Sequence, residues 1–542
     1  MKKIKTPSPA LPHFTLLGML GVCAITGNAY GFQAYSSDDM SVHWDNTVQY
    51  NLGMRVKDAD DRILNNPAFH ESNKKFSDAG DIVTNRINVL SELDVIYKKD
   101  FGFRLSGSAW RDFAYDSDVE FDPAVMPAGS SYSGNKYDSY TDRYYRSGAQ
   151  VLDAFLFAFR DNYSVRLGRL TQFWGNAVFF GAQGINYSQN AADNIKGSAS
   201  PGTEAKELAI PRAQILYEAQ LSDNLSIATQ YFLEFQPNRN PEGGTYLGAA
   251  GFLWYGPDRM LGGLSRGSDY EPDEINNNFG VKLSWTPEWL QGTLGVYYRR
   301  LDEVQPWAPM AEYDSAGSMR SYHLAHADDV TLIGLSLDKQ IGTLSTGFEL
   351  SWRKDTALNS AMNTTGLGHE GARGDTLNVI ANAISGLTPN RFYDTGTAVM
   401  ELAYTRKLSV SDNKELYNGE NDGGCPTGSK WDGCSTDDSL AVAASVTPQW
   451  LQVYPGLDLS MPLFVQYGVS GNAATLNGGV AQGAMVYTAG ISALYRQTYK
   501  ATLQYNGYDA RAKTQNGIYT SGNGAFMWND RDWISLTLSA TF

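Results

Sequence analysis

Cysteine and histidine are scarce in this sequence, and long apolar runs are missing. The chain has three Cys and six His among 542 residues. No apolar stretch reaches the roughly 20 residues that a membrane-spanning helix needs, and the mean hydropathy is only −0.35. These features exclude a disulfide-rich scaffold and speak against a bundle of membrane helices.

Signatures of catalysis and of nucleic-acid binding are also weak. No pair of His has the HExxH spacing of a zinc hydrolase, and the Gly-rich stretch 256–267 lacks the Lys-Ser/Thr of a phosphate-binding loop. Acidic residues outnumber basic ones, 58 to 43, so a nucleic-acid surface is not expected. We therefore predict a protein that is not an enzyme, has no cofactor and binds no nucleic acid.

The N-terminal residues are typical of a secretory signal peptide. A Lys-rich start precedes an apolar stretch at 14–26, which is too short to span a bilayer, and small residues surround Tyr30. We predict a signal peptide at 1–31 and a single exported domain at 32–542.

Two cysteines remain in the exported domain, within a polar stretch. Cys425 and Cys434 most simply form a loop disulfide, and the alternative, a metal site, would need further Cys or His nearby. Acidic stretches at 58–61 and 412–422 lack the regular ligand spacing of a calcium loop. We interpret them as solvated surface and predict no metal site.

What the sequence does contain is many Tyr and Gly, 32 and 54, and a strict alternation of apolar and polar residues. Residues 41–56 alternate along about sixteen positions, and residues 532–542 end the chain in the same pattern. A soluble strand averages about five or six residues, whereas a tilted membrane strand needs about 9–11. We expect the last strand to pair with the first, which would leave no open edge.

Short turns alternate with long polar segments along the chain, as in outer-membrane barrels. Counting the strand at 375–385, we predict an all-β fold: a transmembrane antiparallel β-barrel of about 18 strands, with 16 as the alternative. The turns would be periplasmic and the long loops extracellular. The expected location is the outer membrane of a Gram-negative bacterium, and the expected partners are its lipid and the barrel-assembly machinery, with the protein a monomer.

The alternation also assigns side chains to the two faces of the barrel. Aromatic residues at the short-turn ends are expected to form an interfacial girdle: Trp44, Tyr97, Phe101, Phe159, Tyr163, Trp285, Trp289, Trp450, Tyr495 and Tyr499. Charged residues on the other face are expected to line the lumen: Arg86, Glu92, Asp94, Arg104, Arg166, Lys282, Glu349, Glu401 and Lys500. These charges either brace the lumen wall or set the solute preference, and the sequence leaves both interpretations open.

One long segment, 168–211, is rich in small, aromatic and amide residues. Its large rings would be poorly placed in open water, so we predict that it folds into the lumen and narrows the pore. The alternative is an ordinary surface loop. The residues expected at the constriction are Trp174, Asn176, Phe179, Phe180 and Tyr187.

Several phrases in this region carry a family resemblance. GRLTQFWGNAVFFGAQGIN, then PGTEAKELAIPRAQ, then LSDNLSIATQYFLEFQPNRNPEGGTY resemble the family catalogued as domain of unknown function 1302. The resemblance covers most of the exported chain and is strongest over 165–247. It implies an exported proteobacterial protein that works beside a periplasmic lipid-carrier-like protein and an inner-membrane pump. It supplies no catalytic residues.

The leading hypothesis is an outer-membrane channel or transporter for a small hydrophobic or amphiphilic molecule. The alternative is a surface adhesin or receptor whose barrel is plugged. An outer-membrane lipid-modifying enzyme ranks third, because the sequence shows no Ser and His expected on adjacent strands at the same membrane level.

Overall fold

The structure is a computed structural model that describes residues 33–199, 203, 205–260, 263–275, 277–307, 310–313, 316–362 and 368–542. The expected signal peptide at 1–31 lies outside these residues. Strands dominate the described chain, and its longest helix, α4 (Asn194–Ala199), has six residues. No helix in this part of the chain is long and apolar enough to cross a membrane.

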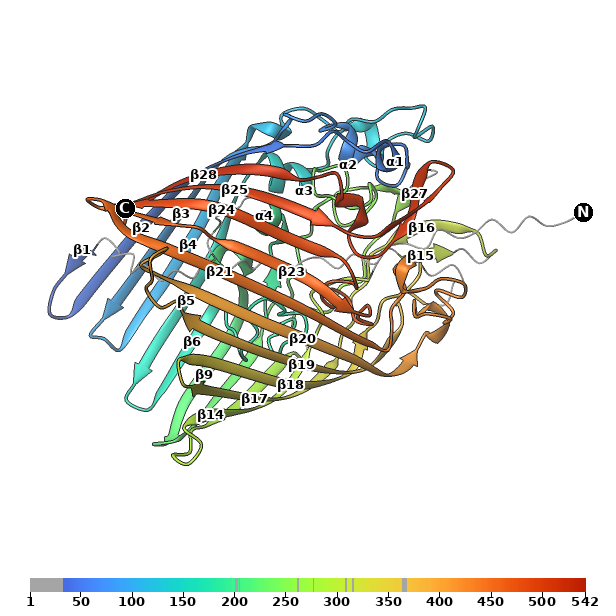
Figure 1. Ribbon diagram of the computed structural model, residues 1–542. Helices are drawn as coiled ribbons and strands as arrows, with labels where there is room; N and C mark the ends of the chain where they lie inside the picture. Colours follow the sequence, from blue (N-terminus) through green and yellow to red (C-terminus); the bar gives the residue numbers. More distant parts are fainter. Residues whose placement is uncertain are drawn as a thin grey trace, which may run out of the picture.

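Antiparallel strands form one closed ring (Figure 1). The main sheet contains 20 strands, but β1 (Gln33–Ser36) only flanks β2, and β22 (Leu457–Ser460) and β23 (Leu463–Ser470) are two halves of one interrupted strand. The ring therefore has 18 positions, which confirms the predicted barrel. The other ring strands are β2 (Met40–Arg55), β3 (Ile82–Tyr97), β4 (Phe101–Asp112), β5 (Ser147–Arg160), β6 (Tyr163–Leu170), β9 (Arg212–Ser222), β10 (Leu225–Phe232), β13 (Phe279–Trp285), β14 (Gly292–Leu301), β17 (Val330–Ile341), β18 (Leu344–Ala357), β19 (Arg373–Gly386), β20 (Thr395–Asp412), β21 (Asp438–Tyr454), β24 (Met485–Tyr495), β25 (Tyr499–Asp509) and β28 (Trp533–Thr541).

The last strand closes the ring against the first, as the alternation predicts. β28 pairs with β25 on one side and with β2 on the other, where Leu538 lies opposite Tyr50 and Leu536 opposite Leu52. The backbone of Phe542 exchanges two hydrogen bonds with that of Asn46. Closure leaves no open sheet edge, and an open edge would be costly in a bilayer.

The period of two puts apolar side chains outside and polar side chains inside. On β3, Ile87 and Val89 are exposed, whereas Arg86, Asn88 and Glu92 between and beyond them are buried inside. All the strands follow the same rule with local exceptions. At the short-turn end, many of the aromatic side chains expected in the girdle are exposed on the outside: Trp44, Tyr97, Phe101, Phe159, Tyr163, Trp285, Trp289 and Tyr499.

The short turns gather at one end of the barrel and the long segments at the other (Figure 1). The expected strand at 375–385 lies within β19. The stretch TPQWLQVYPG (447–456) predicts a hairpin turn, but this prediction is wrong in extent, because β21 continues as a strand to Tyr454.

The long segments carry small elements of their own. These are α1 (Asp61–Leu64), α2 (His70–Lys74), α3 (Ser139–Thr141), α5 (Ala205–Leu208), β7 (Ala191–Ala192), β8 (Ala209–Ile210), β11 (Arg259–Met260), β12 (Leu264–Arg266), β15 (Met310–Tyr313), β16 (Met319–His323), β26 (Ala512–Gln515) and β27 (Ile518–Gly522). The largest cluster of buried apolar side chains lies beneath these segments and inside the ring, and a second one surrounds Trp174 and Leu301.

Candidate functional site

The segment between β6 and β9 enters the barrel. We call its described residues within 171–211 the inward segment. Both ends join neighbouring strands of the ring, so the segment leaves and re-enters the wall at nearly the same point. Between these ends it contacts the inner face of distant strands, through the side chains described next.

Glu349 on β18 holds the first turn of the inward segment. Its side chain points inside and is 1% exposed. One carboxylate oxygen accepts hydrogen bonds from the backbone N–H groups of Asn176 and Ala177, and the other accepts one from Ile185 at 2.7 Å. A carboxylate that accepts several backbone N–H groups is a strong, charge-assisted anchor.

Glu401 on β20 repeats this arrangement two strands away. The side chain is fully buried, and it accepts hydrogen bonds from the backbone N–H groups of Val178, Phe179 and Phe180 at 2.6–2.7 Å. The amide of Asn382 also donates to it at 3.2 Å. Together the two glutamates bind six consecutive or nearby N–H groups, so they fix the path of the chain at the inner wall.

Two arginines bind the carbonyl groups of the same turn. Arg299 on β14 donates to the carbonyl oxygens of Ile185 and Tyr187 at 2.8 and 2.7 Å. Arg353 on β18 donates to that of Gly184, and its guanidinium lies 3.8 Å from the centroid of the Tyr187 ring. Two negative and two positive side chains of the wall therefore all bind the inward segment. Sequence analysis missed both arginines, although the alternation along β14 and β18 places them inside.

The far end of the inward segment reaches the opposite wall. Lys196 of α4 pairs with Glu207 at 2.8 Å and donates to Ser108 on β4, while Asn88 on β3 donates to Glu207. In the ring order, β3 and β4 lie seven to nine positions from β18 and β20, about half of the 18-position ring. The segment therefore crosses the lumen from one wall to the other.

Several lumen charges expected from the sequence pair with each other instead of facing open space. Arg104 contacts Glu92, Asp94 and Asp153 at 2.5, 2.7 and 3.1 Å, and Asp94 stands opposite Arg104 in the register, as expected. Lys206 of the inward segment also pairs with Glu92, so a cluster of two cations and three carboxylates braces the wall where β3, β4 and β5 meet.

The remaining expected lumen residues lie at separate places. Arg86 is buried and donates to a backbone carbonyl, Arg166 pairs with Glu218 at 3.4 Å, and Lys282 lies 5.7 Å from the centroid of the Tyr297 ring. Lys500 lies on β25 near the short-turn end, half buried. The structure does not bring these four side chains together into one site.

The five residues expected at the constriction divide into two groups. Phe179, Phe180 and Tyr187 line a central cavity. Trp174 packs instead against the wall, with its ring centroid 6.3 Å from that of Tyr297. Asn176 lies over Gly347: a Cβ added to Gly347 would lie 2.8 Å from the side chain of Asn176. These last two fasten the segment to the wall and do not face the cavity.

The cavity lies between the inward segment and the wall formed by β23 and β25. It contains about 1300 Å³ of space that protein atoms do not fill, part of it open to solvent. Aromatic rings and small side chains make most of its lining, together with several Asn and Gln side chains. Mostly apolar pockets with a few polar groups are the usual form of small-molecule sites.

Residues 237–258, which we call the outer plug, fill the long-loop end of the barrel. The segment is almost wholly buried, and Tyr132 and Tyr137 donate hydrogen bonds to the carbonyls of Gly243 and Gly244. Position 243 requires glycine because the backbone of Gly251 approaches it closely: an added Cβ would lie 2.0 Å from the carbonyl oxygen of Gly251. Burial raises the pKa of the Glu242 carboxyl well above its usual value.

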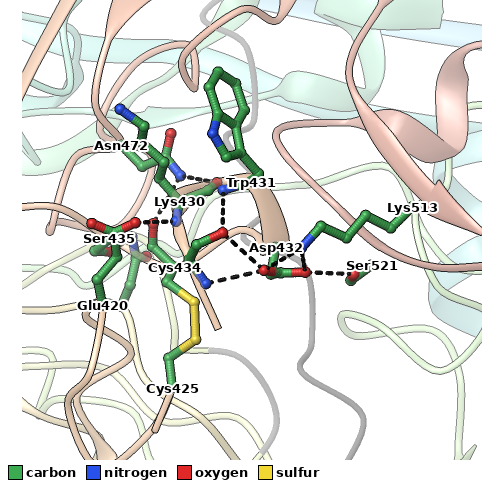
Figure 2. Close-up of a disulfide and its surroundings, with 12 residues drawn as sticks. Glu420, Cys425, Lys430, Trp431, Asp432, Cys434, Ser435, Asn472, Lys513 and Ser521 are labelled. Atoms are coloured by element: carbon green, nitrogen blue, oxygen red, sulfur yellow. Dashed lines mark hydrogen bonds and ion pairs between the residues drawn. A yellow bond between two sulfur atoms is a disulfide. The ribbon is translucent and has the colours of Figure 1, made fainter. Parts of the chain in front are cut away.

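The two cysteines form a disulfide at the rim of the long-loop end (Figure 2). Beside it, Asp432 pairs with Lys513 at 2.6 Å and accepts a hydrogen bond from Ser521, which ties this loop to the β26–β27 hairpin. Partial burial raises the pKa of Asp432, but hydrogen bonds led by that from Lys513 outweigh burial and leave the pKa below its usual value.

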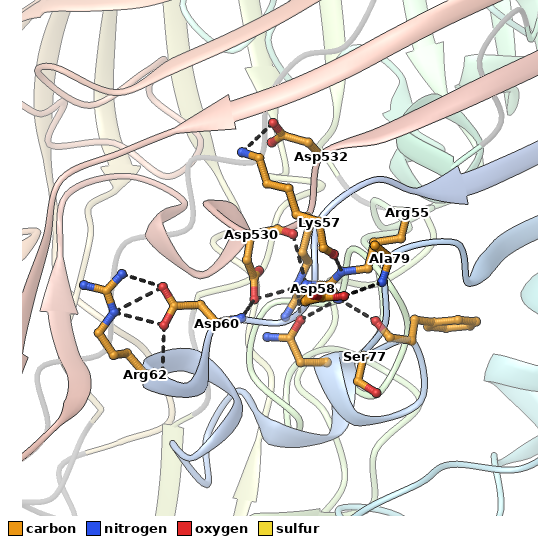
Figure 3. A network of polar contacts seen from close by, with 12 residues as sticks. Arg55, Lys57, Asp58, Asp60, Arg62, Ser77, Ala79, Asp530 and Asp532 are labelled. Carbon is orange, nitrogen blue, oxygen red and sulfur yellow. Dashed lines mark hydrogen bonds and ion pairs between the residues drawn. The ribbon is translucent and has the colours of Figure 1, made fainter.

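Acidic side chains of the stretch at 58–61 bind other groups of the same chain (Figure 3). Asp60 pairs with Arg62 at 2.5 Å, Asp58 accepts from the backbone of Ala79, and Asp530 pairs with Arg55. Throughout the described chain, no group of three or more His, Cys, Asp or Glu is arranged to hold a metal ion.

One stretch, Gly263-Leu264-Ser265-Arg266-Gly267, has the GxSxG spacing of a hydrolase nucleophile, and the expectation that the sequence contains no such motif was wrong. Its Ser lies within β12, opposite Ser321 of β16, in a small sheet of the outer loops. A nucleophile of this kind needs a sharp turn from strand to helix, and β12 does not provide one.

Comparison with known proteins gives one family and several distant structures. The family described as "Protein of unknown function (DUF1302)" matches residues 13–542. The sequence has no significant match among curated proteins.

Solved structures with similar folds include three outer-membrane proteins. OccAB1 of Acinetobacter baumannii is 9% identical, with 92% of this chain and 96% of that chain covered and a TM-score of 0.42. OccK3 (OpdO) of Pseudomonas aeruginosa is 9% identical, with 92% and 95% covered and a TM-score of 0.40. The outer membrane protein OpdK of the same organism is 10% identical, with 92% and 98% covered and a TM-score of 0.39. At this level of similarity we draw no functional inference from them.

Proposed function

The chain belongs to the DUF1302 family, whose description gives no activity, and we propose from the lumen geometry that it is an outer-membrane channel or transporter. Its solute would be a small hydrophobic or amphiphilic molecule. The exposed apolar faces of the barrel strands support a place in lipid, and the closed ring supports the outer membrane of a Gram-negative bacterium.

The observation that carries the proposal is the central cavity. Aromatic rings of the inward segment, Phe179 and Phe180, line it together with Tyr508 and Trp528. Such a lining would bind an apolar body by burying its surface, at about 25 cal/mol per Å². None of the lumen charges expected from the sequence is among the described residues that line this cavity, so affinity would come from the rings and amides and not from fixed charge.

The test removes the tip of the inward segment. We expect that replacing residues 176–186 with a short Gly-Ser linker increases the passage of a small neutral sugar into proteoliposomes in a swelling assay. A control variant replaces the two-residue turn between β17 and β18, Gly342 and Thr343, with Gly-Ser at the short-turn end. Equal solute passage in the deleted, control and unaltered proteins would contradict a gating role for this segment.

The second candidate function is a surface adhesin or receptor with a plugged barrel. The observation that favours it is the outer plug, which is almost wholly buried among the long loops. Planar-bilayer recordings distinguish the two: this alternative predicts no conductance even after the outer plug and the tip of the inward segment are both removed.

We further propose that the solute is exchanged with a periplasmic lipid-carrier-like protein and an inner-membrane pump, with the barrel working as a monomer. The support is the family resemblance alone. Site-specific crosslinking from the short turns, for example at Lys99 or Arg496, tests the contact: recovery of a periplasmic partner from either position is the expected result.

A further inference from the structure

Several polar atoms that line the central cavity have no hydrogen-bond partner among the described residues. Both amide atoms of Gln183 are buried without a partner, as are the side-chain oxygens of Asn186 and Gln466 and the indole N–H of Trp528. Gln183 and Gln466 are each only 2% exposed. Buried polar groups are nearly always paired, because an unpaired one costs free energy. This concentration at one cavity points to a missing hydrogen-bonding partner.

Two of these side chains approach the same part of the wall. A Cβ added at Gly479 would lie 3.5 Å from the side-chain nitrogen of Gln183 and 3.7 Å from the Cβ of Ala441. Gln466 on β23 stands opposite Ala443, which is two residues from Ala441 on the same face of β21. Diagonal neighbours of this kind lie about 7–8 Å apart. Gln183 and Gln466 therefore face one small region of the cavity.

The described residues that line the cavity carry no free charge. Their one ionisable acid or base, Asp193, pairs with Arg239 at 3.0 Å and accepts a hydrogen bond from the backbone of Lys196. The amide groups can both donate and accept, whereas no unpaired cation is available to neutralise a carboxylate. A charged solute would lose its water shell here without gaining a counter-charge.

From these observations we propose that Gln183 and Gln466 form a recognition subsite for the hydroxyl or carbonyl group of an uncharged amphiphile. The apolar body of this molecule packs against Phe180 and Tyr508. The proposal rests on the proposed transport function, and it specifies the substrate class: neutral amphiphiles are accepted, and anions of the same shape are rejected.

The test uses three probes that share one ring system: naphthalene, naphthol and naphthoate. Binding is measured by calorimetry with the full-length exported protein in lipid nanodiscs, and empty nanodiscs supply the correction for partition into lipid. For the unaltered protein we expect naphthol to bind about 5- to 10-fold more tightly than naphthalene, the size of one net hydrogen bond. Naphthoate should bind more weakly than either.

Gln183→Leu keeps the bulk of the side chain and removes its hydrogen bonds, and Gln466→Leu is the second variant. Each should lower the affinity for naphthol about 5- to 10-fold and leave that for naphthalene unchanged. The matched control is Gln340→Leu, on the exposed end of β17, which should alter neither affinity. Strand circular dichroism and heat-modified gel mobility check that every variant is folded.

The possible results distinguish the recognition subsite from the transport function. If naphthol and naphthalene bind equally, or if both Leu variants keep the preference for naphthol, the subsite is wrong and the amides hold only water. Tightest binding of naphthoate would overturn the neutral class. Intact naphthol recognition without any solute passage in the swelling assay would leave the subsite in place and reject transport.

Discussion

Removal of the Glu401 carboxylate is the sharpest test of how the inward segment is held. The backbone N–H groups of Val178, Phe179 and Phe180 all donate to this carboxylate, inside the barrel and away from water. In Glu401→Ala the three donors lose their acceptor, and each buried unpaired donor costs about 1–3 kcal/mol. The local opening of this turn should therefore become easier by roughly 3–9 kcal/mol.

Hydrogen–deuterium exchange measures this opening directly. A loss of about 3 kcal/mol corresponds to a change of roughly 100-fold in the opening equilibrium, so residues 176–180 should exchange at least that much faster. Glu401→Gln keeps one acceptor oxygen, which can still bind the N–H groups of Phe179 and Phe180. In this variant the exchange should be only about 10-fold faster than in the unaltered protein. Planar-bilayer recordings should show larger and noisier currents for the Ala variant than for the Gln variant.

Glu218→Ala is the matched control. Its carboxylate also lies on the barrel wall, but it pairs with Arg166 and is 36% exposed, with no hydrogen bond to the inward segment. This variant should leave the exchange of residues 176–180 unchanged. The reasoning is refuted if exchange there is the same in Glu401→Ala and Glu218→Ala, because the carboxylate would then not hold the turn.

Two further predictions concern the long-loop end. Replacing Cys425 and Cys434 together by Ser opens a loop closed over nine residues, which costs about 2–3 kcal/mol of chain entropy; proteolysis there should accelerate while conductance stays the same, and an unchanged cleavage rate would contradict this. His326 is buried with a pKa lowered by burial to about 4, below its ordinary 6.5, so the neutral ring stabilises the fold above pH 6.5 and that contribution is lost as the pH falls toward 4. Exchange of the loop around His326 should therefore rise over this interval and lose that dependence in His326→Gln; a flat profile in the unaltered protein would contradict the assignment.

The barrel could be predicted from the sequence because its rule is local and repeated. Each strand alternates apolar and polar residues, and a change of one residue in register would turn every side chain to the wrong face. Both ends of the chain lie on the same side only if the number of strands is even, and this condition predicts the strand at 375–385, where β19 lies. The exception, the turn predicted at 447–456, contains Pro448 and Pro455, which are turn-forming residues, yet β21 pairs with β20 as far as Gln449 and then with β22 at Trp450 and Tyr454.

The roles of the lumen side chains could be predicted only in part. Alternation assigns Glu349 and Glu401 to the inner face, where the structure has them, but it cannot say which groups they bind. Their partners are backbone N–H groups more than 160 residues away in sequence, and backbone donors leave no mark in a sequence. The same limit explains why Trp174 was assigned to the constriction, although its ring packs against the wall.

The placement of charge decides between the two interpretations of the lumen that the sequence left open. Glu349, Glu401, Arg299 and Arg353 are all used to hold the inward segment, and Arg104 is surrounded by carboxylates. Paired charges in a protein interior produce a much weaker field than free ones, and an ion that enters such a site pays several kcal/mol of desolvation. A neutral solute pays little of this cost and gains the aromatic contact. In this barrel, selectivity against ions therefore follows from charges that hold the inward segment or brace the wall and do not line the cavity, and the unpaired amides of the cavity are left as the groups that can distinguish one neutral molecule from another.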